Sequence, residues 1–153
     1  MRIALFAGSF DPITKGHEDI VRRAIPLFDK IIVAMGVNSV KTYHFSEERR
    51  MMFLEATFAS SPSIEVLKYD GLTADFCKKH QVNAILRGLR NATDFDYEYS
   101  IAHLNKHLNK ELETVFLAAS PEFICFSSTI VREILKGGRD PSPYLPRPVI
   151  DLI

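Results

Sequence analysis

The stretch AGSFDPITKGH near the amino terminus combines residue types that suit phosphate binding. Gly8 and Pro12 predict a tight corner after an apolar run, and a helix expected to begin near Gly16 places His17 in its first turn. Free backbone N–H groups and the positive end of the helix dipole make such a helix start an anion site. His17 is placed to donate a hydrogen bond to a phosphate oxygen, although a tight turn with an incidental histidine explains the same residues.

Two later stretches also carry side chains that bind anions. Arg87 and Arg90 occur in RGLR, and guanidinium groups suit bidentate contact with phosphate, although a solvated surface pair is the alternative. SSTIVRE, which starts at Ser127, places hydroxyl groups at the start of a helix, where they commonly serve only as caps. All three stretches follow predicted strands, which favours a shared anion site over three separate explanations.

Five apolar runs predict strands, and segments of helical period separate them. The runs cover residues 3–7, 31–37, 64–69, 84–88 and 114–119. The alternating order predicts an α/β fold, a single domain (1–153) with a doubly wound, five-stranded parallel sheet and right-handed crossovers. Ligands bind outside the carboxyl ends of such strands, where the candidate residues fall.

The helical segments carry further boundary signals. Pro26 should kink or end the first helix, and Ser46 offers a hydroxyl cap to the second. A shorter helix is expected within 73–81, and the last should stop at Gly137. The fourth carries an apolar stripe of Tyr97, Ile101, Leu104 and Leu108.

Residues 140–153 hold four of the eight prolines, which predicts an extended surface tail. The exposed apolar residues of this tail and the cluster of Met51, Met52 and Phe53 fit either an interface or the core.

Charge and cysteine content limit the classes of function. The 19 basic and 19 acidic residues cancel, so no overall field holds a nucleic acid or an anionic membrane. No segment reads as a signal peptide or a membrane span. Cys77 and Cys125 form neither a disulfide framework nor a thiolate metal site, and Cys77 on a helical stripe is expected in the core. We therefore expect a cytoplasmic protein.

Several common motifs are absent. Neither G-x-G-x-x-G nor G-x-x-x-x-G-K-[ST] occurs, which argues against a classical dinucleotide site and a Walker-type hydrolase. His103 and His107 lie four residues apart but lack the glutamate of H-E-x-x-H and a third ligand, so no metal site is assigned to the protein.

The three stretches in this order resemble the bacterial phosphopantetheine adenylyltransferase family. GSFDPITKGH resembles the first signature of nucleotidyltransferases in which an H-x-G-H motif binds ATP, and SSTIVRE resembles their second. RGLRNATDFDYEYSIAHLNKHL lies between them, and the likeness covers essentially the whole chain. Thr14 replaces the first histidine, as in the T-x-G-H form of this family. Phe126 replaces an isoleucine of the second signature, and Thr73 replaces a larger apolar residue.

The resemblance implies a Rossmann-like nucleotidyltransferase fold. It implies adenylyl transfer from ATP to 4'-phosphopantetheine, giving dephospho-coenzyme A and pyrophosphate, the penultimate step of coenzyme A biosynthesis. Matching positions imply an ATP site of Ser9, Phe10, His17, Gly88, Leu89, Arg90, Glu98, Phe123, Ile124, Cys125, Phe126, Ser127, Ser128 and Thr129. They imply a substrate site of Ser9, Lys41, Leu72, Thr73, Arg87, Asn105 and Glu133. The family also implies Mg²⁺ carried by the ATP phosphates, a homohexamer, and feedback inhibition by coenzyme A.

The implied nucleophile is a phosphate oxygen, which is already ionised near neutral pH because its second pKa is about 6. No general base is needed, so catalysis should consist of positioning and charge stabilisation. We expect His17, Lys41 and Arg90 to be the catalytic residues. His17 would stabilise charge at the α- and β-phosphates, Lys41 with Arg87 would hold the attacking phosphate, and Arg90 with the helix start at Ser127 would hold the pyrophosphate.

Three alternatives remain open on the sequence alone. A related nucleotidyltransferase would act on another phosphorylated acceptor, such as nicotinate mononucleotide or glycerol phosphate. A non-catalytic nucleotide-binding module would share the fold, because fold does not imply function. A fragment of an aminoacyl-tRNA synthetase would share the H-x-G-H idea, but this chain lacks a K-M-S-K-S-like loop and a basic surface.

Overall fold

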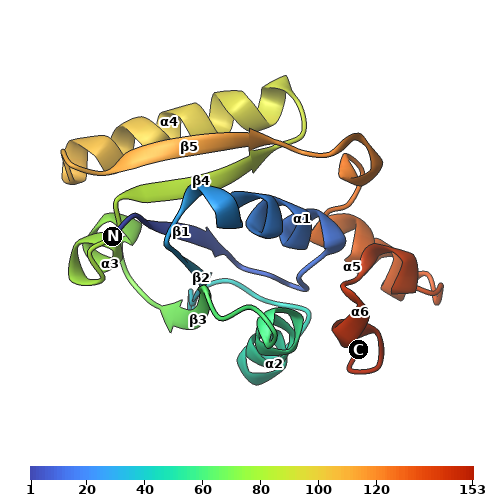
Figure 1. Ribbon diagram of the computed structural model, residues 1–153. Helices are drawn as coiled ribbons and strands as arrows, with labels where there is room; N and C mark the ends of the chain where they lie inside the picture. Colours follow the sequence, from blue (N-terminus) through green and yellow to red (C-terminus); the bar gives the residue numbers. More distant parts are fainter.

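A five-stranded sheet runs through the middle of the molecule, and all of its strands are parallel (Figure 1). The computed structural model describes residues 1–153. The strands are β1 (Ile3–Gly8), β2 (Lys30–Gly36), β3 (Ile64–Tyr69), β4 (Ala84–Leu89) and β5 (Glu113–Ala118). Their order in space is β3-β2-β1-β4-β5. The predicted α/β sheet is confirmed, and each strand end lies within about one residue of its expected position.

Helices cover both faces of the sheet. The α-helices are α1 (Lys15–Ala24), α2 (Glu47–Phe58), α3 (Thr73–Lys79), α4 (Ala92–Leu108), α5 (Ser128–Lys136) and α6 (Arg147–Ile150). Short 3₁₀ turns follow at Ile25–Leu27, Pro121–Phe123 and Ser142–Tyr144. Helices α1, α2, α5 and α6 contribute to the larger apolar cluster on one face, whereas α3 contributes to the smaller cluster on the other. No helix combines the length and the apolar character needed to cross a membrane.

The first strand explains why the sheet is buried on both sides. Ala4 and Phe6 belong to the larger cluster, while Ile3, Leu5 and Ala7 belong to the smaller one. Successive side chains of a strand point to opposite faces, so a strand covered on both faces must be apolar throughout. The same alternation in β2 makes these two strands the rigid centre from which the flanking loops extend.

Local signals place the helix ends where the sequence predicts them. Helix α1 ends at Ala24, and Pro26 lies inside the 3₁₀ turn that follows. The Ser46 hydroxyl accepts a hydrogen bond from the backbone N–H of Arg49 at 3.3 Å and caps α2. Helix α5 ends at Lys136, and Gly137 is its C-cap. Cys77 is fully buried, as expected, and burial raises the pKa of its thiol to about 12.

The carboxyl-terminal segment does not form the extended surface tail predicted for residues 140–153. It contains a 3₁₀ turn at Ser142–Tyr144 and helix α6, and both Leu145 and Val149 are fully buried in the core. Prolines are tolerated in the first turn of a helix, where the missing N–H has no intrahelical partner. The prediction was wrong because it counted prolines and overlooked the burial that Leu145 and Val149 offer.

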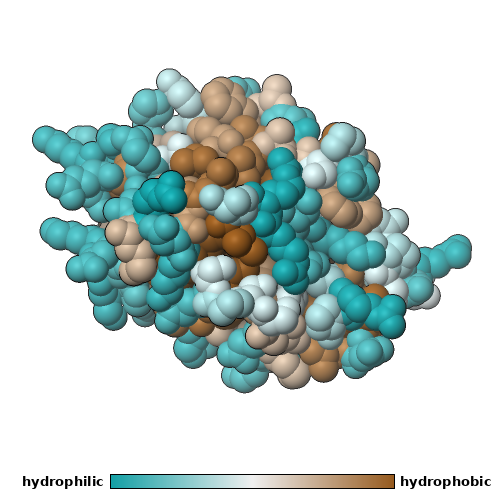
Figure 2. All heavy atoms as spheres, in the orientation of Figure 1, coloured by the Kyte–Doolittle hydropathy of each residue, from teal (hydrophilic) through white to brown (hydrophobic).

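Helix α4 is confirmed, but three of the four residues of its apolar stripe are exposed, and only Ile101 is partly buried. Tyr97, Leu104 and Leu108 are 67%, 51% and 48% exposed, whereas the polar Glu98 and Asn105 are buried. On the other side of the sheet, Figure 2 shows apolar side chains gathered over β4 and β5, bordered by hydrophilic ones. The inward face of α4 is therefore available for polar chemistry.

Candidate active site

The first turn of α1 fixes the orientation of His17. Thr14 is the N-cap, and its hydroxyl accepts a hydrogen bond from the backbone N–H of His17 at 3.4 Å. In return, Nδ1 of His17 accepts the backbone N–H of Thr14 at 3.0 Å. Because Nδ1 accepts a hydrogen bond, the neutral ring carries its proton on Nε2. The T-x-G-H sequence thus creates a histidine that can donate only from Nε2.

The surroundings of His17 keep its ring neutral. Burial, followed by the nearby charges of Arg87 and Arg90, lowers the pKa of His17 to about 4. The rings of Phe10 and Phe6 meet the imidazole edge-on, with centroids 5.4 and 6.2 Å away. At neutral pH this side chain is an uncharged hydrogen-bond donor beside two cations.

The low pKa of His17 predicts that stability depends on pH. Its pKa falls from 6.5 to about 4 on folding, so the unfolded chain takes up the proton first as the pH is lowered. The stabilisation is therefore complete above pH 6.5 and is lost between pH 6.5 and about 4. A shift of this size corresponds to about 3 kcal/mol. Because His17 is only half-buried, we expect a smaller loss, so that the free energy of unfolding falls by about 2 kcal/mol from this group. Urea unfolding at about pH 7 and at about pH 4.5 measures this loss of stability.

The matched variant for this test is His17→Gln, which has no imidazole to titrate. It should lose less stability than the parent over the same pH interval. Equal losses in both proteins would contradict a depressed pKa at His17.

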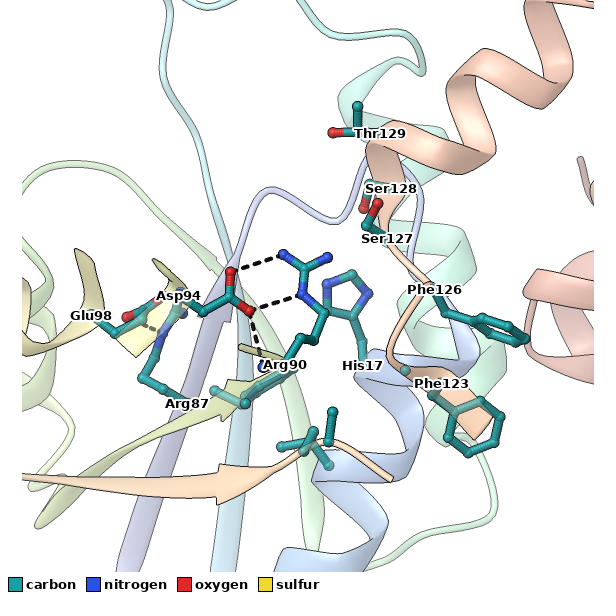
Figure 3. A pocket seen from close by; sticks show the side chains of 15 residues that line it. His17, Arg87, Arg90, Asp94, Glu98, Phe123, Phe126, Ser127, Ser128 and Thr129 are labelled. Atoms are coloured by element: carbon teal, nitrogen blue, oxygen red, sulfur yellow. Dashed lines mark hydrogen bonds and ion pairs between the residues drawn. The ribbon is translucent and has the colours of Figure 1, made fainter. Parts of the chain in front are cut away.

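His17 lies in a cavity of about 290 Å³ at the carboxyl ends of β1 and β4 (Figure 3). We call it the first cavity; it is lined by Phe6, Gly16, His17, Ile20, Arg87, Gly88, Arg90, Asp94, Glu98, Ala119, Phe123, Phe126, Ser127, Ser128 and Thr129. His17 and Arg90 lie near its centre, and the hydroxyl residues that start α5 lie on the far side from Arg87 and Glu98. The three stretches singled out in the sequence therefore meet in one cavity.

Two close approaches shape the first cavity. A Cβ on Gly88 would lie 2.9 Å from Ile20, so only glycine lets α1 pack against β4 at this point. A Cβ on Gly16 would lie 3.1 Å from the backbone oxygen of Phe126. The glycine of RGLR and the glycine of T-x-G-H thus bring the loop after β5 against the start of α1.

Arg90 is held in the first cavity by Asp94. Nε and Nη2 of Arg90 donate to the two carboxylate oxygens of Asp94 at 2.9 and 3.2 Å, and the backbone N–H of Arg90 donates at 3.0 Å. The hydrogen bond from the Arg90 side chain holds the pKa of Asp94 below its usual range. This pairing presents Arg90 toward His17, and its i,i+4 spacing is a signal that the sequence contains.

The start of α5 is tied to the loop after β1. The Ser127 hydroxyl accepts from the backbone N–H of Ile130 at 3.2 Å and caps the helix. The Ser128 hydroxyl donates to the Pro12 carbonyl at 2.7 Å, and Arg132 donates to the Asp11 carbonyl at 2.8 Å. Ser127 is therefore a cap, as the simpler interpretation predicts, whereas Ser128 joins the start of α5 to the loop after β1.

A second cavity of about 630 Å³ lies beside the first. It is lined by Ala7, Gly8, Ser9, Gly36, Val37, Asn38, Ser39, Lys41, Tyr43, Tyr69, Asp70, Gly71, Thr73, Ile85, Arg87, Tyr97, Glu98, Ile101 and Asn105. Nζ of Lys41 donates to the Ser9 hydroxyl at 3.4 Å, and the hydroxyls of Tyr69 and Thr73 are 2.9 Å apart. The second cavity thus offers a cation beside a hydroxyl, and its volume is about twice that of the first.

Arg87 and Glu98 form the border between the two cavities, since both residues line both. Nε and Nη2 of Arg87 donate to the two Glu98 oxygens at 2.8 and 2.5 Å, and Nη1 donates to the Ala7 carbonyl at 2.6 Å. The buried carboxylate therefore fixes the guanidinium against the end of β1.

Most of the predicted site residues line one of the cavities, and the others lie nearby or apart. Ser9 lines the second cavity only, and Phe10 is buried beneath His17. Glu133 lies on α5 outside both cavities, where it pairs with Lys136 at 3.0 Å. The remaining predicted residues outside both linings are Leu72, Leu89, Ile124 and Cys125. Their roles stay predictions.

The chain is similar to one family of known proteins over nearly its whole length. Residues 5–134 match the family described as cytidylyltransferase-like. A protein of Flavobacterium psychrophilum named phosphopantetheine adenylyltransferase is 54% identical over 151 residues, which cover 97% of this chain and 98% of that protein. Proteins of the same name from Flavobacterium johnsoniae and Cytophaga hutchinsonii are 54% and 49% identical, over 95% of this chain and 95% and 97% of theirs. The chain therefore belongs to the cytidylyltransferase-like family and, within it, to the phosphopantetheine adenylyltransferases.

Proposed function

We propose that this protein transfers the adenylyl group of ATP to the phosphate of 4'-phosphopantetheine, giving dephospho-coenzyme A and pyrophosphate. The observation that carries the proposal is the pair of cavities that meet at Arg87. One offers a histidine donor, a second arginine and a helix start, and the other, which is larger, offers Lys41 beside Ser9. Two phosphorylated substrates need this arrangement if their phosphates are to meet.

The chemistry asks for cations and donors without a general base. An oxygen of the acceptor phosphate forms the new bond to the α-phosphorus of ATP, and the bond from that phosphorus to the oxygen bridging to the β-phosphate breaks. Pyrophosphate leaves with that electron pair. The attacking phosphate is ionised near neutral pH, because its second pKa is about 6. The protein must align two anions and stabilise the transferred charge.

The roles of individual residues follow from their places in the two cavities. Nε2 of His17 donates to an α- or β-phosphate oxygen, where negative charge develops during transfer. Arg90 and the N–H groups at the start of α5 hold the leaving pyrophosphate, because a helix start and a guanidinium both favour phosphate oxygens. Lys41, Ser9 and Arg87 hold the attacking phosphate.

The donor set suits Mg²⁺ carried by ATP rather than by a protein cage. Mg²⁺ in nucleotide sites is commonly held by substrate phosphates with few carboxylates. Asp94 and Glu98, the acidic residues of the first cavity, are already engaged by Arg90 and Arg87. We propose that the ATP phosphates, and not these two carboxylates, coordinate Mg²⁺. The bound ion would reduce the negative charge of the phosphates.

Lys41→Ala tests whether the second cavity binds phosphopantetheine and the first binds ATP. Lys41 contacts Ser9 in the second cavity and does not line the first. We expect KM for phosphopantetheine to rise by about 10- to 100-fold, the cost of one charged hydrogen bond, while the Kd for ATP stays near its original value. Steady-state kinetics and calorimetry with ATP alone measure the two quantities. A large loss of ATP affinity would contradict the assignment.

The activity itself is tested by pyrophosphate release from ATP and Mg²⁺. The acceptors are 4'-phosphopantetheine, nicotinate mononucleotide and glycerol phosphate, with a sample without acceptor as the control. Release only with phosphopantetheine supports the proposal. Release with another acceptor points to a related nucleotidyltransferase, and ATP binding without release points to a nucleotide-binding module.

We also propose that the chain assembles as a homohexamer. Helix α4 presents Phe95, Tyr99, Leu104 and Leu108, each between 41% and 51% exposed. Exposed apolar patches of this kind commonly mark interfaces. Light scattering of the purified protein tests whether the particle is a hexamer of 17.4 kDa chains.

Feedback inhibition by coenzyme A is the last part of the proposal. Coenzyme A contains the pantetheine moiety of the acceptor, so it should enter the second cavity and raise the apparent KM for phosphopantetheine. Initial rates at several coenzyme A concentrations test this expectation.

A further inference from the structure

Arg50 is a buried cation without an acidic partner. It lies on α2 at 2% exposure, and its Nη1 donates to the backbone carbonyl of Ser9 at 2.8 Å. Its Nε is the one buried side-chain polar atom in the structure that has no hydrogen-bond partner. A buried charge that is not paired is costly, so this guanidinium is retained against a penalty in folding.

The face of the Arg50 guanidinium lies over an aromatic ring of the second cavity. Its central carbon is 3.8 Å from the centroid of Tyr43. Nζ of Lys41 lies 5.6 Å from the same centroid and 3.4 Å from the Ser9 hydroxyl. Arg50 and Lys41 therefore share two neighbours, Ser9 and Tyr43, although Arg50 itself does not line the cavity.

The loop that Arg50 contacts needs an anchor. Phe10 follows Ser9 and has φ of +47°, a left-handed conformation that is strained for a residue with a side chain. On the other side of the loop, the Asp11 carboxylate accepts the backbone N–H groups of His44 and Phe45 at 2.8 and 2.9 Å. Asp11 thus joins the loop after β1 to the loop that carries Lys41, and Arg50 joins them a second time.

We propose that Arg50 is a positioning residue for the acceptor phosphate. It holds the Ser9 carbonyl with one nitrogen and the Tyr43 ring with its planar face, and so keeps Ser9 Oγ and Lys41 Nζ 3.4 Å apart, close enough for one phosphate to contact both. This inference rests on the proposed function, because it takes the second cavity to be the acceptor site. Arg50 lies outside the second cavity and would act through two residues that line it, Ser9 and Tyr43.

The planar shape of the guanidinium is essential to this role. Lysine would keep the positive charge but cannot both stack flat on Tyr43 and direct a second donor at Ser9. Glutamine would keep a donor and remove the charge. Arg50→Lys therefore removes the planar shape and Arg50→Gln removes the charge, and the proposed role requires both.

The test combines steady-state kinetics for both substrates with calorimetry of ATP. For Arg50→Lys and Arg50→Gln we expect KM for phosphopantetheine to rise by about 10- to 100-fold, the cost of a charged hydrogen bond to a backbone carbonyl. The Kd for ATP should stay within about twofold, because Arg50 contacts no wall of the first cavity. Lys41→Ala combined with Arg50→Gln should cost less than the product of the two single effects, since both act on one site.

The matched control is Phe58→Leu, at the far end of the same helix. Phe58 is buried at 3% exposure and lines neither cavity, so its truncation loosens α2 without touching Ser9 or Tyr43. Its KM for phosphopantetheine should not change. If the Arg50 variants fail to fold, Tyr43→Leu removes the shared ring and should raise the same KM, and Tyr43→Phe should recover most of that loss.

Two results would overturn the proposal. One is an Arg50 variant with a lowered melting temperature but an unchanged KM for phosphopantetheine, which would make Arg50 structural only. The other is an equal loss of affinity for both substrates. Failure of the proposed function is distinguished by the unmodified protein, which would then release no pyrophosphate with phosphopantetheine before any variant is compared.

Discussion

His17→Ala is expected to lower kcat for adenylyl transfer by about 100- to 1,000-fold, the effect of removing one preorganised donor from a transition state. Nδ1 is occupied by the backbone N–H of Thr14, so Nε2–H is the donor that the substitution removes. The donor acts most strongly on charge that develops during transfer, so the Kd for ATP should change less than kcat. Pyrophosphate release at saturating substrates and calorimetry with ATP measure the two effects.

The control for this variant is His107→Ala, an exposed histidine on α4 outside both cavities. His17→Ala also removes one half of the capping box of α1, so its circular dichroism and melting temperature must be compared with those of the parent. A folded His17→Ala protein with nearly normal kcat would refute the assignment. Because the pKa of His17 is about 4, its ionisation should leave no inflection in kcat near pH 6.5.

Short-range signals explain why so much of the fold could be predicted. Each strand is a continuous apolar run, and the helix ends at Pro26, Ser46 and Gly137 are set by residues within one turn. Three stretches at strand ends must then share one sheet edge, because parallel strands all point the same way. The neighbourhood of His17, Arg90 and Ser127 in the first cavity follows from that geometry.

The features that the sequence does not predict depend on contacts between residues that are far apart in the chain. Arg50 lies 41 residues from Ser9, and no pattern within α2 indicates that its guanidinium is buried. The hydrogen bonds between His17 and Thr14 are local, but the low pKa of His17 depends on its burial in the folded chain and, next, on the charges of Arg87 and Arg90, which are distant in the sequence. The outward stripe of α4 was equally hidden, because periodicity shows that a face is apolar and not what covers it.

Two cations of the cavities, Arg87 and Arg90, are held in fixed orientations in the protein without substrates. Arg87 and Arg90 are each held by a carboxylate, whereas Lys41 is held only by a hydroxyl. A fixed guanidinium needs no reorganisation when charge develops, which is the electrostatic form of catalysis. Lys41 has no carboxylate partner, so its charge is available to an anion without breaking an ion pair. Arg87 lines both cavities, so we expect its loss to affect activity more than the loss of Arg90 or Lys41.

Arg87→Met is expected to lower kcat/KM for phosphopantetheine by about 1,000-fold, because it removes a fixed cation that both substrates face. It should also lower the free energy of unfolding by about 3 kcal/mol, since it leaves the buried Glu98 carboxylate without its cation. Urea unfolding and initial rates measure the two losses. Any substitution of Arg87 alone therefore confuses a catalytic effect with a stability effect.

The double variant Arg87→Met with Glu98→Met separates them. Replacing both members of a buried ion pair by apolar side chains is often neutral for stability, so most of the free energy of unfolding should return. The activity should not return, because neither methionine can bind phosphate. If activity recovers together with stability, Arg87 only supports the fold at the border of the cavities. If stability recovers and activity stays low, the guanidinium that Glu98 fixes against Ala7 acts on the phosphates themselves.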